Sequence, residues 1–174
     1  PGDDIVPLCL LLLLTVLLRV SLPSEQVHIY DRYEMAYLDA LEELFGALDM
    51  ILGESGCVLC MENLGNFNLS FIKKGLEMLL SSEHIGLTWD FGHDTTAHLV
   101  DTPFFESHID AIREIHLHDS LDGSDHRALF TGNTDCEKAL RIARQRSIPI
   151  VVEVKTLEGL QSSLVQLNNR GYCT

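Results

Sequence analysis

Stretches with a helical spacing of apolar residues alternate with short apolar runs from about residue 33 onward. In segment 34–52 the apolar residues recur every three or four positions, at Leu38, Leu41, Leu44, Phe45 and Leu48. This spacing predicts a helix that ends before Gly53. Further helices are predicted over 69–80, 103–112, 135–145 and 157–168, and strands over 57–62, 85–90, 114–119 and 149–154. Residues 26–30 are a candidate extra strand.

Strands that alternate with helices predict an α/β protein with a parallel sheet, because parallel neighbours need a long crossover connection. A doubly wound sheet and a (β/α)₈ barrel both fit this alternation. No G-x-G-x-x-G motif follows any predicted strand, so the sequence lacks the fingerprint of a dinucleotide-binding unit.

Composition and charge narrow the choice of function. The 174 residues are 46% hydrophobic and 22% charged, which is typical of one globular domain rather than a disordered chain. The net charge of −14 disfavours a nucleic-acid partner, because such a surface repels phosphates.

Five cysteines form no regular disulfide framework, which favours a reducing, cytoplasmic location. Cys57 and Cys60 lie in an apolar run, so we interpret them as part of a buried strand rather than a zinc or redox site.

The first 25 residues have a different character. Residues 5–22 are nearly all Leu and Val, whereas Asp3 and Asp4 stand where a signal peptide would have positive charge. Pro7 and Arg19 interrupt the run, which disfavours a membrane-spanning helix without excluding one. We expect residues 1–25 to form a buried helix of a larger, truncated fold, and residues 26–174 to form the part that holds the chemistry.

Ionisable residues stand at the end of all four main predicted strands. They are Glu62, Asp90 with His93, His116 with Asp119, and Glu153. The carboxyl ends of parallel strands meet at one edge of a sheet or barrel, where enzymes of these folds place their sites. A mixed set of carboxylates and imidazoles suits one divalent ion such as Mn²⁺, Mg²⁺, Co²⁺ or Zn²⁺.

Each of these residues also has a purely structural interpretation. Glu62 could cap a helix, and Asp90 with His93 could be an N-cap and a turn histidine. His116 and His118 share one face of the predicted strand, where a hydrogen-bonded core histidine is common. Glu153 has apolar neighbours, so its carboxylate needs a partner if it is buried.

Four short motifs occur in order along the chain. They are Glu62-Asn63, Asp90-Phe91-Gly92-His93, His116-Leu117-His118-Asp119 and Glu153, with Asp125-His126 ahead of Gly132. With these motifs the chain resembles the C-terminal half of the xylose isomerase-like TIM barrel superfamily. That superfamily includes sugar-phosphate isomerases and epimerases and the type IV apurinic endonucleases. The resemblance implies an incomplete (β/α)₈ barrel that covers about strands 4 or 5 to 8.

The resemblance also implies roles for these residues. Glu62, Asp90, His116 and Glu153 would bind one divalent metal ion. Glu62 and Glu153 would also act as base and acid in a proton transfer through a metal-stabilised enediolate. His93 and His126 would contact the substrate. His118, Asp119 and Asp125 would lie behind the ligands, with His118 and Asp119 orienting His116. Asp125 and His126 could alternatively supply further metal ligands, as in the endonuclease branch.

Three functional hypotheses follow. The favoured one is a metal-dependent isomerase or epimerase of a sugar or sugar phosphate, with neither nucleic acid nor membrane as a partner. A type IV apurinic endonuclease-like phosphodiesterase would need several metal ions and a basic groove, which the charge of −14 disfavours. A non-catalytic barrel fragment is the third, because a full barrel takes about 250 residues. Exposed barrel edges would then favour a homo-oligomer.

Overall fold

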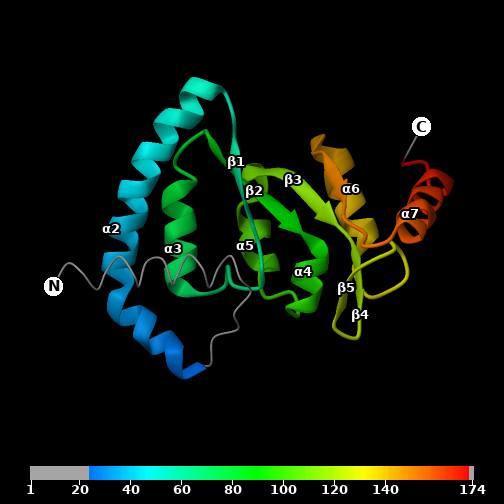
Figure 1. Ribbon diagram of the computed structural model, residues 1–174, viewed down its shortest axis with the longest axis horizontal. Helices are drawn as coiled ribbons and strands as arrows, with labels where there is room; N and C mark the ends of the chain where they lie inside the picture. Colours follow the sequence, from blue (N-terminus) through cyan, green and yellow to red (C-terminus); the bar gives the residue numbers. More distant parts are fainter. Residues whose placement is uncertain (1–23, 173–174) are drawn as a thin grey trace. The chain divides into compact units, whose positions relative to one another are not determined.

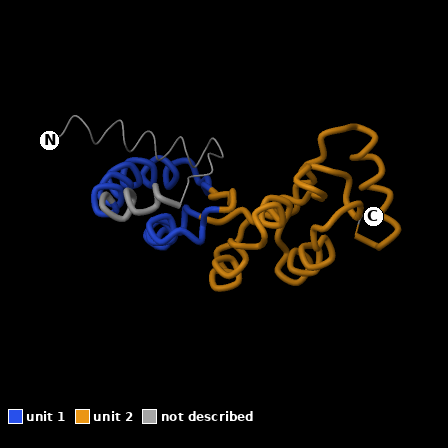
Figure 2. Tube along the Cα trace, turned by 90° about the horizontal axis from the view of Figure 1, so that it is seen from below, with its two compact units in different colours: residues 1–59, 66–85 blue, residues 60–65, 86–174 orange. Residues whose placement is uncertain are grey.

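The computed structural model describes residues 24–172, with side chains from residue 34 onward. The expected helix over 1–25 therefore lies outside the described residues, apart from its last two positions. The chain divides into two compact units (Figure 2). The first comprises 1–59 and 66–85, and the second comprises 60–65 and 86–174.

Two helices form the first unit, α2 (Ser24–Ser55) and α3 (Ser70–Leu79), and they pack side by side (Figure 1). Phe71 is buried in α3, and its ring meets that of Tyr37 edge to face at 5.5 Å. Gly75 allows a close approach, because a Cβ there would lie 2.9 Å from Leu41 Cδ2. The candidate strand over 26–30 is wrong, since these residues lie within α2. No glycine or proline separates them from the helical stretch, so the helix continues through them.

The main sheet has the strand order β1-β2-β3-β6 (Figure 1). Its strands are β1 (Leu59–Glu62), β2 (Ile85–Asp90), β3 (Ile112–Leu117) and β6 (Ile150–Val152). β3 is parallel to both of its neighbours, β2 and β6. A separate antiparallel hairpin follows β3 and consists of β4 (Asp119–Leu121) and β5 (Ser124–Arg127). Asp122 and Gly123 turn this hairpin with positive φ angles, as Asp-Gly pairs commonly do.

Helices follow the strands of the second unit. They are α4 (Phe91–Thr96), α5 (Thr102–Ser107), the 3₁₀ turn η1 (Ile109–Ala111), α6 (Cys136–Arg146) and α7 (Leu157–Asn169). The helix expected over 103–112 is shorter than predicted, because α5 ends before His108 and β3 already begins at Ile112. The core lies around β2, where the Trp89 ring stacks on Phe91 at 4.3 Å and on Phe105 at 4.8 Å.

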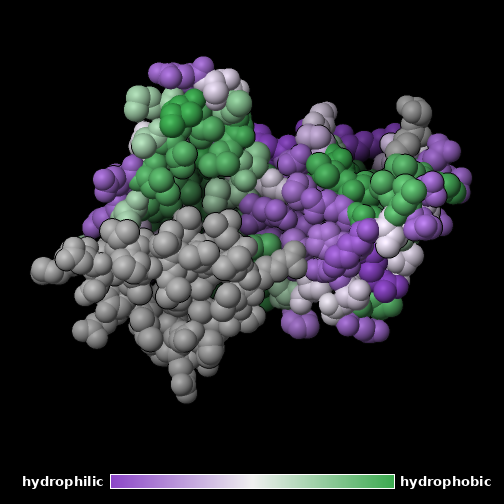
Figure 3. Space-filling model, in the orientation of Figure 1, coloured by the Kyte–Doolittle hydropathy of each residue, from purple (hydrophilic) through white to green (hydrophobic). Residues whose placement is uncertain are grey.

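Hydrophobic side chains also remain at the surface of each unit. Figure 3 shows them over α2 and α3 in the first unit and along α7 in the second. Met50 and Ile51 of α2 and Leu164 and Val165 of α7 are exposed. In the part of the chain that is described, no helix combines the length and the hydropathy needed to cross a membrane.

The expected (β/α)₈ barrel is wrong. The described strands form an open four-stranded sheet and a separate two-stranded hairpin, with β1 and β6 as the outer strands of the larger sheet. The protein is therefore a small α/β structure. Alternating strands and helices predict parallel pairing, but the same alternation is compatible with an open sheet and with a closed one, and this explains the error.

Candidate metal centre

Four side chains from the four strands of the main sheet meet at one edge of it. Glu62 ends β1, Asp90 ends β2, His116 lies in β3 and Glu153 follows β6. One oxygen or nitrogen atom from each lies within 4.8 Å of the corresponding atoms of the others. The register explains the convergence, because Asp90 pairs with His116 and the Glu153 N–H donates to the Leu117 carbonyl at 3.1 Å. All four residues belong to the second unit.

The imidazole of His116 lies between the two glutamates. Its Nδ1 is 3.4 Å from Oε1 of Glu62 and 3.5 Å from Oε1 of Glu153. The close approach of the Glu62 carboxylate raises the pKa of His116 to about 9, with further help from Glu153 and against the effect of burial. The same interaction, together with one from His93, holds the pKa of Glu62 well below its usual range. In the absence of a metal ion, the carboxylates thus hold a proton on this imidazole.

Asp90 has one carboxylate oxygen in use and one without a hydrogen bond. Its Oδ1 caps α4 by accepting the main-chain N–H of His93 at 2.8 Å, so the structural interpretation as an N-cap is also correct. Its Oδ2 and Nδ1 of His116 are buried and make no hydrogen bond of regular geometry to a described residue, although His93 Nδ1 lies 3.2 Å from the first and Glu62 Oε1 lies 3.4 Å from the second. Buried polar atoms of this kind are costly and rare in folded proteins.

These four side chains fit a divalent cation. A cation between them would satisfy both Asp90 Oδ2 and His116 Nδ1, and three carboxylates with one imidazole form a donor set typical of Mn²⁺, Co²⁺, Mg²⁺ or Zn²⁺. Asp90 is fully buried, whereas the side chains of Glu62 and Glu153 are 35% and 31% exposed. The two glutamates are therefore the most accessible members of the set, ahead of His116 at 16%.

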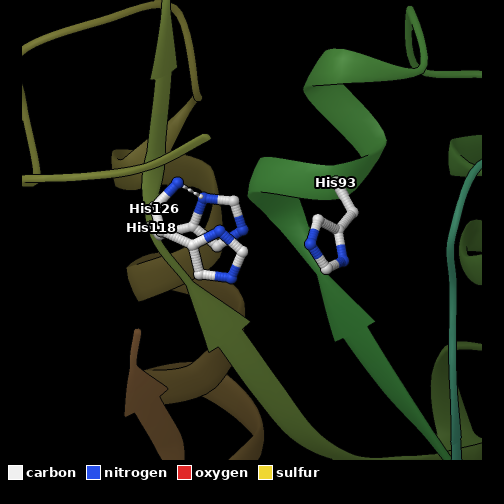
Figure 4. Close-up of side chains that lie close together, drawn as sticks. All are labelled: His93, His118 and His126. Carbon is white, nitrogen blue, oxygen red and sulfur yellow. Dashed lines mark hydrogen bonds between the residues drawn. The ribbon is translucent and has the colours of Figure 1, made fainter. Parts of the chain in front are cut away.

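Three histidines form a second group beside the first (Figure 4). His93 comes from α4, His118 follows β3 and His126 lies in β5. The rings of His118 and His126 stack at 4.0 Å with an interplanar angle of 7°, and the His93 ring meets both of them edge-on. One nitrogen atom from each ring lies within 4.8 Å of the others, so the distances between these nitrogens are compatible with a bound metal ion.

The two histidines expected at the substrate lie against the carboxylates of the metal centre. His93 Nδ1 is 3.3 Å from Oε1 of Glu62 and 3.2 Å from Oδ2 of Asp90. His126 Nε2 is 3.6 Å from Oε2 of Glu153. Both imidazoles thus border the site from the side of α4 and of the hairpin, and their contact with a substrate stays a prediction.

The residues expected behind the ligands have other partners than expected. His118 contacts Asp90 through Nε2 at 3.1 Å, not His116. Burial lowers the pKa of His118, but the Asp90 carboxylate raises it above its ordinary value on balance. Asp119 is fully buried, and its carboxylate accepts the main-chain N–H groups of Ser120, Thr131, Gly132 and Thr134. Asp125 contacts Lys155 and, at 3.2 Å, Nδ1 of His126.

Sequence reasoning assigned no role to three polar residues that support the site. The Asn63 side chain bonds the main chain of Asp90, and Glu114 Oε2 lies 3.3 Å from Nε2 of His116. Asp94 is buried and accepts hydrogen bonds from Trp89 Nε1 and the Thr102 hydroxyl. The sequence contained a signal for the role of Asn63, because this residue directly follows the glutamate at the end of a predicted strand. It contained none for Asp94, which looks in sequence like a surface residue of a helix.

Comparisons with known proteins give a fold but no family. No protein-family model matches the sequence, and no curated protein matches it either. The structure is similar to that of 3-keto-D-glucoside 4-epimerase, YcjR, from E. coli in its apo form, with a TM-score of 0.54 and 15% sequence identity. The similarity covers 88% of this chain and 57% of that one, so the chain spans little more than half of the epimerase.

The comparisons and the open sheet correct the expected membership in the xylose isomerase-like TIM barrel superfamily. What they support is a small α/β protein whose fold is similar to that of a sugar epimerase. At 15% identity this similarity concerns the fold, and the function has to be argued from the site itself.

Proposed function

We propose that this protein is a divalent-metal-dependent enzyme that epimerises or isomerises a keto sugar. The observation that supports the proposal most is the convergence of Glu62, Asp90, His116 and Glu153 within 4.8 Å, with two of their buried atoms lacking hydrogen bonds. The fold similarity to 3-keto-D-glucoside 4-epimerase supports sugars with a carbonyl group as the substrate class.

Glu62, Asp90, His116 and Glu153 would hold the cation. When bound, a divalent ion supplies Lewis-acid polarisation of a carbonyl oxygen and of the neighbouring hydroxyl, which acidifies the C–H bond between them. Asp90, which is fully buried, and His116, whose side chain is 16% exposed, are the less accessible members of the set and would fix the position of the ion. The two glutamates are the more exposed members, so proton transfer falls to them.

Glu62 and Glu153 are suited to proton transfer by their placement. They come from the two outer strands, β1 and β6, with Asp90 and His116 on the strands between them. One carboxylate would take the proton as the C–H bond breaks, and its electron pair forms the carbon–carbon double bond of an enediolate while the carbonyl electrons pass to oxygen. The other would return a proton to the opposite face, which gives an epimer, or to the adjacent carbon, which gives an isomer.

His93 and His126 border the two carboxylates and would bind substrate hydroxyl or carbonyl oxygens. His93 is 7% exposed and lies within 3.3 Å of Glu62, whereas His126 lies beside Glu153. Each imidazole is thus next to one member of the proposed acid–base pair. The two imidazoles could therefore hold the oxygen atoms on either side of the reacting carbon in place. Orienting a substrate in this way lowers the activation free energy by several kcal/mol.

The proposal is tested by hydrogen exchange in deuterated water. The full chain is stripped of metal, reloaded with Mn²⁺ or Co²⁺ and incubated with 3-keto-glucosides and ketohexoses, and proton NMR follows the C–H groups beside the carbonyl. We expect metal-dependent loss of one C–H signal and formation of an epimer or isomer. Glu62→Gln and Glu153→Gln should slow the exchange about 100-fold or more, whereas the exposed Glu158→Gln is the matched control. Folded, metal-loaded protein that exchanges no substrate proton would contradict the proposal.

A further inference from the structure

The carboxylates at the metal centre carry more negative charge than one bound ion can offset. Glu62, Asp90 and Glu153 belong to the proposed ligand set. Glu114 is a fourth acid at the same place, because its Oε2 lies 3.3 Å from Nε2 of His116. One divalent cation offsets two of these four charges, and a neutral imidazole ligand adds none. Two formal negative charges therefore remain at the loaded centre.

This excess charge lies where a substrate would approach. The side chains of Glu62, Glu114 and Glu153 are all partly exposed. A molecule that reaches the ion from solvent therefore comes close to three carboxylates. Partly exposed charges act over roughly 8 to 10 Å at physiological ionic strength, which exceeds the reach of a direct contact. The charge of the substrate thus matters even at atoms that touch no protein group.

The basic groups beside the centre have acidic neighbours of their own. The main-chain N–H of Lys155 donates to the His126 carbonyl at 3.1 Å, and its ammonium group pairs with Oδ1 of Asp125. The same oxygen lies 3.2 Å from Nδ1 of His126, and Oδ1 of Asp90 lies 3.1 Å from Nε2 of His118. Coulomb attraction depends on distance and not on hydrogen-bond geometry. A positive charge on any of these groups is thus offset locally.

The helices that follow β2 and β6 have their N-termini occupied by acceptors of the chain itself. Open helix N-termini attract phosphate through unpaired N–H groups and the helix dipole. Asp90 caps α4, and the Thr156 hydroxyl caps α7 by accepting the N–H of Gly159 at 3.0 Å. Glu158 adds a carboxylate to the first turn of α7. These helix ends therefore attract an anionic ligand less than open ones would.

We propose that the metal centre selects uncharged keto sugars over their phosphate esters, with Glu114 and Asp125 as the residues that determine this specificity. The inference rests on the proposed function and names its substrate class. Glu114 supplies negative charge beyond the ligand set, and Asp125 offsets the charge of Lys155. A phosphate ester brings about two further negative charges at neutral pH. The resulting repulsion acts on binding and so weakens affinity for the ester.

Binding to the full chain loaded with Mn²⁺ tests the selection. Mn²⁺ is paramagnetic and broadens the NMR signals of a molecule bound beside it, so affinity is measured whether or not the molecule reacts. The ligands are D-fructose and its 1- and 6-phosphates. We expect both phosphates to bind at least about 10-fold more weakly than fructose at low salt, and this difference to shrink in about 0.5 M sodium chloride. Equal affinities would overturn the proposal, as would a difference that salt leaves unchanged.

The metal-free chain provides an arm that does not depend on the proposed function. Its centre keeps the four carboxylates, and inorganic phosphate is the probe, followed by phosphorus-31 NMR. We expect no binding at millimolar phosphate, and saturable binding in this range would overturn the inference. If the loaded chain binds neither fructose nor its phosphates, the proposed function fails, and the metal-free arm decides the inference by itself.

Single variants then locate the charges that matter. Glu114→Gln removes one carboxylate, and Asp125→Asn removes the charge that offsets Lys155. Each should raise the affinity for the phosphates relative to fructose by roughly 3- to 10-fold. Glu83→Gln removes the same charge at an exposed position of the first unit and is the matched control. An equal gain in the control would overturn the proposal. Tighter binding of a phosphate than of fructose, lost in Arg127→Gln, would also overturn it and assign a phosphate site to that residue.

Discussion

The Asn63 side chain pairs with the main chain of Asp90 through two hydrogen bonds. Its Nδ2 donates to the Asp90 carbonyl at 3.1 Å, and its Oδ1 accepts the Asp90 N–H at 2.8 Å. Both residues are fully buried. The pair joins the ends of β1 and β2 and so holds Glu62, which precedes Asn63, next to Asp90. Two members of the metal centre thus depend on one amide side chain for their spacing.

Replacing Asn63 by Ala should lower both stability and metal affinity. The substitution leaves the buried N–H and C=O of Asp90 without partners, at about 1 to 3 kcal/mol for each group. Urea unfolding of the metal-free chain measures the first effect, and Mn²⁺ titration measures the second. The exposed Asn68→Ala is the control and should change neither. An Asn63→Ala protein with the stability of the wild type would contradict this role.

Asp119 should prove to be a structural residue of the 131–134 loop. Its carboxylate accepts four main-chain N–H groups, so Asp119→Asn turns an NH₂ group towards two of these donors. We expect a loss of at least about 2 kcal/mol in the free energy of unfolding, and a change within about 0.5 kcal/mol for the exposed Asp122→Asn. Equal unfolding midpoints for the two variants would show that the loop does not depend on Asp119.

Gly92→Ala should displace the His118 ring, because the added methyl group would lie 2.1 to 2.5 Å from three of its atoms. We expect weaker Mn²⁺ binding and a shifted nitrogen-15 signal of His118. Gly46→Ala is the matched control, since nothing lies within 4 Å of a Cβ at that position. It should preserve metal binding and leave stability unchanged or slightly higher, as expected for alanine in a helix. Normal metal affinity in Gly92→Ala would argue against the close fit.

The stability of the metal-free protein should depend on pH through His116. Its pKa is raised from 6.5 to about 9 in the folded state, chiefly by Glu62, so the folded state binds the proton more tightly than the unfolded state. The contribution is complete below pH 6.5 and is lost as the pH rises through about 9. Denaturant unfolding in EDTA should therefore show a decline in stability over this interval. A decline of equal size in His116→Gln would assign it to other groups.

The sequence predicted the local elements and the composition of the centre well. Apolar periodicity placed α3, β2, α6 and α7 within two residues of their observed ends. Glu62, Asp90, His116 and Glu153 were grouped because they end successive strands, and the structure brings them together. Their role as metal ligands stays a prediction.

Other features depend on spatial contacts that periodicity does not encode. Sheet closure was predicted incorrectly, because a run of strands and helices is compatible with an open sheet and with a barrel. His118 was expected to orient His116, a role that the resemblance implied, and to share a face of the predicted strand with it. The strand ends at Leu117, so the alternation of side chains ends there, and His118 lies instead against Asp90. The pairing of Asn63 with Asp90 spans 27 residues and leaves no local pattern.

The metal content of the purified chain tests the central claim most directly. Elemental mass spectrometry is performed after reloading with micromolar Mn²⁺, Co²⁺ or Zn²⁺, on the wild type, His116→Ala, Glu153→Gln and the control Glu158→Gln. The account predicts about one divalent ion per chain, retained in the control and lost in the other two variants. A folded wild-type chain that binds none of these ions, or variants of His116 and Glu153 that bind as much metal as the wild type, would contradict it.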